Sequence, residues 1–265
     1  MGDDIGGDAT GDARAVVQYE LAGGVATITL DSPRNRNALS KPMRAQLTAA
    51  LTRAAADDAV RVVVLTHTGT VFCAGMDLKE TAVAKPGEEG VRELPAILRL
   101  VSHCPKPVVA RLAGPARAGG VGILAACDIA VAVDTATFAF TEVRIGLIPA
   151  TISIPVLARM NPVAARELLL TGEVFDAARA REIGLVNAAV EADALDATVE
   201  RYVDALLAGG PSALAGTKAL LADRVDDSES RYAELLELSA RQFDTAEARD
   251  GARAFAEKRP PSWRR

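Results

Sequence analysis

The chain has 265 residues, of which 49% are hydrophobic, 25% are charged and 4% are aromatic. That length suits one large domain, or one domain with an appended helical region, and the composition is typical of a globular protein. The formal net charge of −5 argues against nucleic acid as a partner, because proteins that bind it present a basic surface.

Two further features limit the class of protein. The sequence contains no apolar stretch long enough to cross a membrane, so we expect no membrane partner. Its three cysteines, Cys73, Cys104 and Cys127, are odd in number and lack the spacing of metal ligands. We therefore expect three reduced thiols, no bound metal and a cytoplasmic location.

Residues 1–13 are acidic and rich in glycine, which predicts a disordered tail. From residue 14 to residue 190, strand-like and helical patterns alternate, which favours a mixed α/β core with parallel crossovers. We expect strands at 15–21, 25–30, 61–66, 107–112, 128–133, 137–140 and 185–190.

The predicted helices lie between these strands and after them. We expect them at about 41–56, at 91–102, from 119, and between 149 and about 180 with breaks at Pro155, Pro162 and Gly172. The segment 84–90 is predicted to be a mobile loop. Residues 191–265 are expected to form a helical C-terminal region of three segments, the last at 231–258.

The segment 113–129, AGPARAGGVGILAACDI, carries the strongest local signal for a binding site. It follows the predicted strand at 107–112, and Gly119 and Gly120 open a buried helix. Small residues allow another molecule to approach the backbone, and the first N–H groups of a helix have no intrahelical partner. The segment therefore predicts a site for an oxyanion or a phosphate.

A second segment of this kind is THTGTVFCAGMDLKE at 66–80. Ala74 and Gly75 have almost no side chain, so a ligand can reach their backbone N–H groups. In isolation such a segment is more typical of a plain turn. Together with Gly119, however, it offers two backbone donors from two separate loops, as an acyl-transfer or enolate-forming site needs.

Glu142 is the candidate for acid–base chemistry, because it stands between two apolar stretches. Partial burial would raise the pKa of its carboxyl towards a useful range. The alternative is an ion pair with Arg144 or with another arginine. Structural roles are the better interpretation for four other polar residues, namely His67, His103, Cys73 and Asp128.

Five motifs in this order make the sequence similar to the crotonase superfamily of enoyl-CoA hydratases and isomerases. They are RNALS at 36–40, FCAGMDLKE at 72–80, PKPVVARLAGPARAGGVGILAACDIAVA at 105–132, FTEVRIGLIP at 140–149 and LTGEVFDAARAREIGLVN at 170–187. The resemblance covers about residues 14–260. It implies a core of repeated ββα units at 14–190, a helical trimerisation region at 191–265, and trimers that often pair into hexamers.

The resemblance also implies a coenzyme A thioester as substrate, with no metal or redox cofactor. It assigns Ala74 and Gly119 as the oxyanion donors and Glu142 as the proton-transfer residue. The substrate contacts that it implies are Asn37, Ala38, Leu39, Ala74, Gly75, Met76, Asp77, Leu78, Gly119 and Gly120. Phe255 and Lys258 match positions near the coenzyme's phosphates, often on a neighbouring subunit.

One position departs from the family pattern. Standard hydratases carry a second glutamate three residues after the oxyanion glycine, where this chain has Gly122. The run EVRIGLIPATIS resembles a branch described as methylglutaconyl-CoA or enoyl-CoA hydratases, which favours hydration of a 2-enoyl-CoA to a 3-hydroxyacyl-CoA. A lone Glu142 instead favours Δ3-Δ2-enoyl-CoA isomerisation.

Three other functions agree less well with the sequence. Dienoyl-CoA isomerase and hydroxyacyl-CoA hydrolase are disfavoured, because both expect an extra acid near 149–151, where the chain reads Pro-Ala-Thr. A non-catalytic acyl-CoA binding protein is conceivable with Gly122. Glu142 argues against it, because burying a carboxylate without a function is costly.

Overall fold

The computed structural model describes residues 15–83, 90–222, 236–237, 241–242 and 245–263. Its larger sheet has six strands in the order β1-β2-β3-β4-β6-β9. These are β1 Val17–Ala22, β2 Val25–Leu30, β3 Val62–His67, β4 Val108–Leu112, β6 Ile129–Val133 and β9 Ala188–Val190. β1 pairs with β2 in antiparallel fashion and the other pairs are parallel, which confirms the predicted mixed α/β core.

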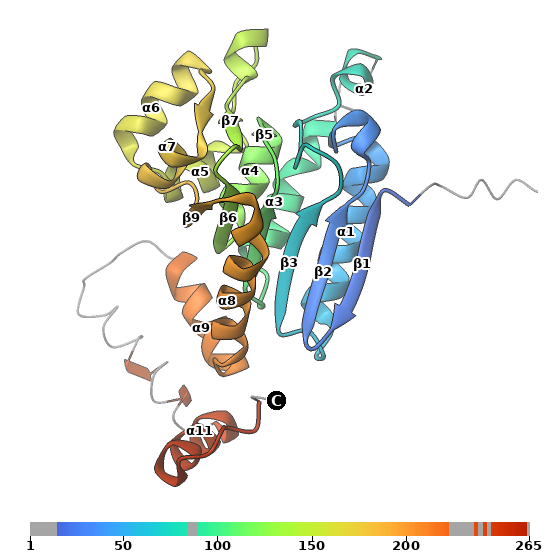
Figure 1. The fold of residues 1–265 in the computed structure, drawn as a ribbon. Coiled ribbons are helices and arrows are strands. Elements are labelled where there is room, and N and C mark those ends of the chain that lie inside the picture. The colour runs from blue at the N-terminus through green and yellow to red at the C-terminus, as the bar shows by residue number, and fades with distance from the viewer. Residues whose placement is uncertain (1–14, 84–89, 223–235, 238–240, 243–244, 264–265) are drawn as a thin grey trace, which may run out of the picture.

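Helices cover both faces of this sheet (Figure 1). α1 Lys41–Ala56, α3 Leu94–Ser102 and α4 Gly119–Ala126 pack beside one another, and α8 Leu195–Leu207 contacts β3, β4 and β6. Burial on both faces explains why all six residues of β3 (VVVLTH) are buried. β2 lies nearer the edge of the sheet, and its residues alternate between half-buried and buried. The buried residues, Ala26, Ile28 and Leu30, face the core.

Of a smaller sheet with three short strands, only the strand near 137–140 was predicted. The sheet consists of β5 Ala116–Arg117, β7 Thr137–Ala139 and β8 Phe175–Asp176, with β7 in the middle. β5 and β8 have two residues each, too few to show any periodicity in the sequence. The Phe175 ring packs against Phe138 and Phe140, with centroids 5.7 and 6.0 Å away. This sheet fixes the start of α4 relative to the residues that follow β7.

The segment from 149 to 182 contains α5 Ser153–Arg159, α6 Pro162–Thr171 and α7 Ala177–Glu182. The predicted breaks at Pro162 and Gly172 are confirmed, because α6 begins at Pro162 and Gly172 closes it with a φ of +63°. The predicted break at Pro155 is wrong. Pro155 lies in the first turn of α5, where its missing N–H costs no hydrogen bond.

Short helices flank these elements: α2 Leu78–Val83 and the 3₁₀ helices η1 Pro33–Asn35, η2 Gly90–Arg92, η3 Glu142–Ile145 and η4 Ala192–Ala194. The C-terminal region adds α9 Pro211–Ala222 and α11 Ala246–Glu257. In Figure 1, α11 lies beyond α9, and Glu247 joins the two because it accepts from the Ser212 N–H at 2.9 Å. Lys218 joins α9 to the core, because its Nζ lies 2.6 Å from the Asp128 carboxylate.

Some predictions concern residues that the structure does not describe. The tail at 1–13 and residues 84–89 of the predicted loop lie outside the described residues. So does much of the first part of the predicted segment 231–258. Among the helices that are described, none is long and apolar enough to span a membrane.

Candidate active site

The loop that follows β3 meets the start of α4. Cys73 forms a parallel bridge with Ala116 in β5, and the Arg117 N–H donates to the Cys73 carbonyl at 2.9 Å. This pairing brings Gly75 next to Gly119. A methyl group added at Gly75 would lie 3.5 Å from the Gly119 nitrogen and 3.1 Å from the Arg117 oxygen. The structure thus brings together the two glycine segments that the sequence singled out.

The hydrogen bonds of this loop argue against Ala74 as an oxyanion donor. The Ala74 N–H donates to the Arg36 carbonyl at 3.0 Å, so it is already satisfied inside the protein. Two residues further on, the Met76 N–H has no acceptor within the described part of the chain. The free backbone N–H of this loop is therefore that of Met76, which the sequence had marked as a substrate contact only.

The Gly75–Met76 peptide is held in a fixed orientation. The Leu39 N–H donates to the Gly75 carbonyl at 2.8 Å. Because C=O and N–H point in opposite directions in a trans peptide, this bond directs the Met76 N–H away from Leu39. Gly75 has a φ of +88°, and a side chain there would also crowd Ala118, 3.0 Å from its Cβ. Glycine is therefore required at this position.

The second donor belongs to the first residue of α4, all of whose residues are buried. The Gly119 N–H has no acceptor among the described residues. The preceding carbonyl, that of Ala118, accepts from the N–H groups of Val121 and Gly122 at 2.9 and 3.1 Å. The Gly119 N–H therefore points away from the helix, towards Gly75 and the loop.

Ala118 itself has an unusual backbone conformation, with φ +47° and ψ −119°. Its N–H donates to the Ala139 carbonyl at the end of β7, at 3.0 Å. Such a conformation costs on the order of 1–3 kcal/mol in a residue with a side chain and persists only where the surroundings enforce it. Here β7 and the first turn of α4 enforce it from the two sides of Ala118.

Glu142 begins η3, three residues after Ala139. Three residues span at most about 11 Å, so Glu142 lies within that distance of Ala139, whose carbonyl binds the residue before α4. Its side chain is half-buried, and its Oε2 is buried without a hydrogen-bond partner in the described residues. Burial raises the pKa of this carboxyl above its usual range. In the described structure no ion pair joins it to Arg144 or to any other arginine, so the alternative interpretation is not observed.

One turn after Gly119, Gly122 packs directly against Ile152. A Cβ added at Gly122 would lie 2.8 Å from the Ile152 Cβ and closer still to its Cγ2. Ile152 precedes α5 and is 1% exposed. An isoleucine side chain thus fills the space that a side chain at position 122 would enter.

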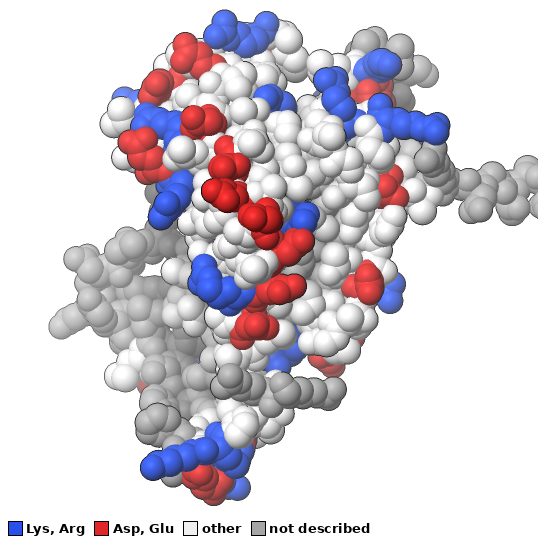
Figure 2. All heavy atoms as spheres, in the orientation of Figure 1, with Lys and Arg blue, Asp and Glu red and all other residues white. Residues whose placement is uncertain are grey.

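A cavity of about 330 Å³ opens beside this loop. It is lined by Arg34, Asn35, Arg36, Ala38, Ala74, Met76, Asp77, Leu78 and Lys79. The lining therefore includes five of the predicted substrate contacts and three cationic side chains. Figure 2 shows Lys and Arg side chains gathered around this end of the molecule, near α2.

The side chain of Asn37, a predicted substrate contact, is bound inside the protein. Asn37 is fully buried. Its Oδ1 accepts from the Ser32 N–H at 2.7 Å, and its Nδ2 donates to the carbonyls of Thr68 and Val71 at 3.0 and 2.7 Å. These bonds use the amide to hold the loop together. The next residue but one, Leu39, lies at the site, since its Cδ1 would be 3.2 Å from a Cβ at Gly119.

Phe255 and Lys258 do not join this site within one chain. Phe255 lies on α11, away from α4 (Figure 1), and its side chain is outside the described residues. Lys258 follows the helix and is exposed. Their predicted role near the coenzyme's phosphates therefore depends on a second subunit.

The other polar candidates have structural surroundings. The His67 Nε2 accepts from the Ala113 N–H at 3.0 Å, and burial lowers the pKa of His67. Burial raises the pKa of the Cys73 thiol to about 12, which makes it a poor nucleophile. His103 is exposed and its Nδ1 lies 2.8 Å from the Ser102 hydroxyl, while Asp128 accepts from the Val108 N–H at 2.7 Å.

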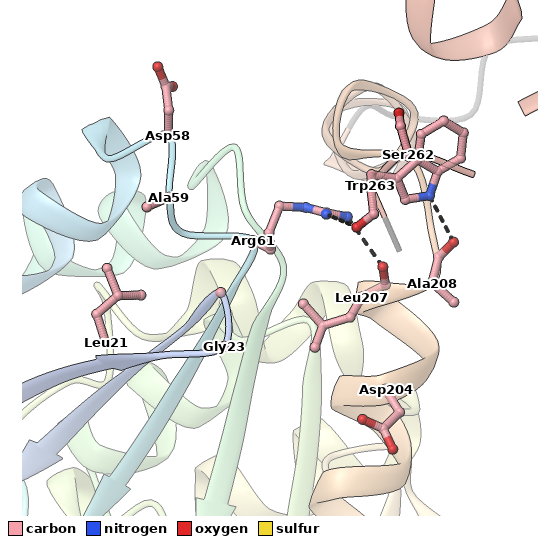
Figure 3. A pocket seen from close by; sticks show the side chains of 11 residues that line it. Leu21, Gly23, Asp58, Ala59, Arg61, Asp204, Leu207, Ala208, Ser262 and Trp263 are labelled. Carbon is pink, nitrogen blue, oxygen red and sulfur yellow. Dashed lines mark hydrogen bonds between the residues drawn. The ribbon is translucent and has the colours of Figure 1, made fainter. Parts of the chain in front are cut away.

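A larger cavity, of about 720 Å³, lies at the opposite end of the main sheet (Figure 3). Arg61, just before β3, donates to the carbonyls of Trp263 and Gly209 at 2.9 and 2.7 Å. The Trp263 indole donates to the Ala208 carbonyl at 3.1 Å. Ligands of open parallel sheets bind at the carboxyl ends of the strands. The loop after β3 is at that end, and Arg61 is at the other.

Several known proteins are similar to this chain over most of its length. A family model described as "Enoyl-CoA hydratase/isomerase" matches residues 20–265. "Enoyl-CoA hydratase EchA19" of Mycobacterium tuberculosis is 35% identical over 92% of this chain and 94% of that protein. "Enoyl-CoA hydratase domain-containing protein 3, mitochondrial" of Danio rerio is 30% identical over 96% and 89%. The solved structure of an enoyl-CoA hydratase from Mycobacterium smegmatis superposes with a TM-score of 0.88, at 36% identity, over 94% of this chain and 99% of that one.

Proposed function

The chain belongs to the enoyl-CoA hydratase/isomerase family, and from its site we propose that it stabilises the enolate of an acyl-CoA thioester. The observation that carries this proposal is the pair of unsatisfied backbone N–H groups on Met76 and Gly119, in two segments that meet where Gly75 lies beside α4.

Two such donors suit a carbonyl oxygen that gains charge during the reaction. Polarising the thioester carbonyl makes the α-carbon more acidic and the β-carbon of an enoyl group more electrophilic. Negative charge then accumulates on the oxygen, where donors that are already oriented stabilise it without reorganisation. Removing one donor of this kind typically costs about 2.7–4 kcal/mol of barrier.

For the reaction itself we propose hydration of a 2-enoyl-CoA, with Glu142 as the proton-transfer residue. Water adds its oxygen to the β-carbon while Glu142 accepts a proton, and the protonated Glu142 then delivers a proton to the α-carbon. One carboxylate suffices if both additions occur on the same face. The raised pKa of the Glu142 carboxyl suits a group that must both accept a proton and donate it again. The hydratase names of the relatives support this reaction.

The contact between Gly122 and Ile152 favours a second candidate, Δ3-Δ2-enoyl-CoA isomerisation. In that reaction Glu142 removes a proton from the α-carbon and returns it to the γ-carbon, so no water is added. Ile152 occupies the place from which a second acid would position water. The same donor pair and the same carboxylate serve either reaction.

Coenzyme A enters as part of the substrate, and we propose that the cavity beside the loop receives it. Arg34, Arg36 and Lys79 would attract its phosphates, while the pantetheine arm passes Met76 towards the donor pair. We further propose a homotrimer, or a hexamer of two trimers. Large apolar side chains are exposed on η3 and α5 and after η3, including Ile148 at 82% and Ile154 at 78%, as expected of a contact surface.

Incubation with crotonyl-CoA, and separately with a 3-enoyl-CoA, tests these proposals. A 3-hydroxyacyl-CoA product from crotonyl-CoA supports hydration, and a 2-enoyl-CoA product from the 3-enoyl substrate supports isomerisation. Glu142→Gln should abolish either reaction while acyl-CoA binding persists. Binding of both thioesters by the wild-type protein without turnover would overturn the enzymatic proposal.

A further inference from the structure

Arg44, on α1, is a buried cation that joins three segments around the candidate site. It is 1% exposed. Its Nη1 donates to the Leu39 carbonyl at 2.7 Å, and its Nη2 lies 2.8 Å from Glu80 Oε1 in α2. Its Nε and Nη2 both reach the carboxylate of Glu93, each at 3.1 Å, just before α3. One guanidinium therefore binds the chain on both sides of residues 84–89.

The bond to Leu39 connects Arg44 with the oxyanion donor of the loop. Leu39 uses its carbonyl to accept from Arg44 and its N–H to donate to the Gly75 carbonyl, at 2.8 Å. That second bond sets the direction of the Met76 N–H, because both belong to the Gly75–Met76 peptide. A continuous series of hydrogen bonds thus runs from the guanidinium to the donor.

Packing keeps the guanidinium in this position. A Cβ at Gly90 would lie 2.5 Å from Arg44 Nη2, so η2 passes directly over the charged group. Burial of a cation is costly, and a well-packed apolar side chain usually gives equal or greater stability. The three partners of Arg44 are therefore better explained by a need to orient the segments around it than by a gain in folding stability.

We propose that Arg44 is a positioning residue that orients the Met76 N–H for the thioester oxygen. Through Glu80 and Glu93, the same side chain fixes the segments that enter and leave residues 84–89 relative to that donor. This inference rests on the proposed function, because it assumes that the Met76 N–H binds the oxygen.

A chromophoric substrate analogue, 4-(dimethylamino)cinnamoyl-CoA, tests the proposal. Its absorption moves to longer wavelength when its carbonyl is polarised, so the shift on binding reports the donors directly. Arg44→Lys should bind the analogue within about threefold of wild type but show a smaller shift. Its kcat should fall about tenfold with KM little changed, because a single ammonium cannot reach Leu39 and both carboxylates. Arg44→Met, with no donor, should show a still smaller shift.

Arg53→Lys is the matched control, because it makes the same exchange on the exposed end of the same helix. It should leave the shift and kcat unchanged. A full wild-type shift and kcat in Arg44→Lys, whatever its thermal stability, would overturn the proposal. If Arg44→Met does not fold, the absorption shift and kcat of Arg44→Lys are sufficient to test the proposal. If wild type itself shows no shift, the oxyanion assignment under the proposed function fails instead.

Discussion

Replacing Gly122 by alanine should destabilise the protein, although alanine is normally favoured over glycine inside a helix by about 1 kcal/mol. The added Cβ would lie 2.8 Å from the Ile152 Cβ, well inside normal contact distance. Rotating χ1 of Ile152 moves its methyl groups but not its Cβ, so α4 and the start of α5 must separate. Overpacking of this kind costs about 1–3 kcal/mol. We expect the upper part of that range, which leaves a net loss of about 2 kcal/mol.

A double-mutant cycle with Ile152→Ala identifies the cause of that loss. Ile152→Ala alone should cost about 2–5 kcal/mol, because it empties a fully buried position. With Ile152 already truncated to alanine, Gly122→Ala should cost less, because the contact with Cγ2 is gone and only the contact with the Cβ remains. The size of the Gly122→Ala effect thus depends on Ile152.

Urea unfolding of the four proteins at one protomer concentration measures the cycle, provided that their m-values agree. The coupling free energy should exceed about 1 kcal/mol. If Gly122→Ala is as stable as wild type, Ile152 does not fill the space beside α4. Ile152 would then not exclude a second carboxylate from position 122.

Variants at three other positions, Glu142, Asn37 and Gly75, test the described contacts. Glu142→Gln should lose at least about 10²-fold in kcat. Burial raises the pKa of Glu142, so the folded protein holds this proton more tightly than the unfolded chain. Wild-type stability should therefore fall as pH rises from about 4.5 through the folded pKa, and urea titrations should show a smaller fall in Glu142→Gln. Asn37→Ala should cost about 1–3 kcal/mol in unfolding free energy, because it leaves two buried carbonyls and one N–H without their partner. Gly75→Ala should lower kcat more than it raises KM, because its methyl would stand 3.5 Å from the Gly119 nitrogen; equal kcat would contradict the donor pair.

The convergence of the two glycine segments could be predicted from the sequence, because residues without side chains mark places where backbones approach closely. Glu142 could be identified for a similar reason, since a carboxylate between apolar runs is desolvated wherever those runs are buried. Both predictions depend on local residue types. The order of the main strands is harder to read locally, yet alternation of strands and helices was enough to predict parallel crossovers.

The choice between the Ala74 and Met76 donors could not be predicted in this way. It depends on the Arg36 carbonyl, which reaches Ala74 from a distant segment, and on the positive φ of Gly75. Both are tertiary properties that leave no periodic pattern. The role of Asn37 was missed for the same reason, because its partners Ser32, Thr68 and Val71 come together only in the folded chain.

The two proposed donors, the N–H groups of Met76 and Gly119, are oriented in the same way. Each N–H belongs to a peptide whose carbonyl is held from behind, that of Gly75 by Leu39 and that of Ala118 by the first turn of α4. Each also follows a residue with positive φ, +88° at Gly75 and +47° at Ala118. The cost of these conformations is met when the protein folds, so the donors need no reorganisation when charge develops on the thioester oxygen. Residues that fix the orientation of these carbonyls should therefore influence the rate without touching the substrate.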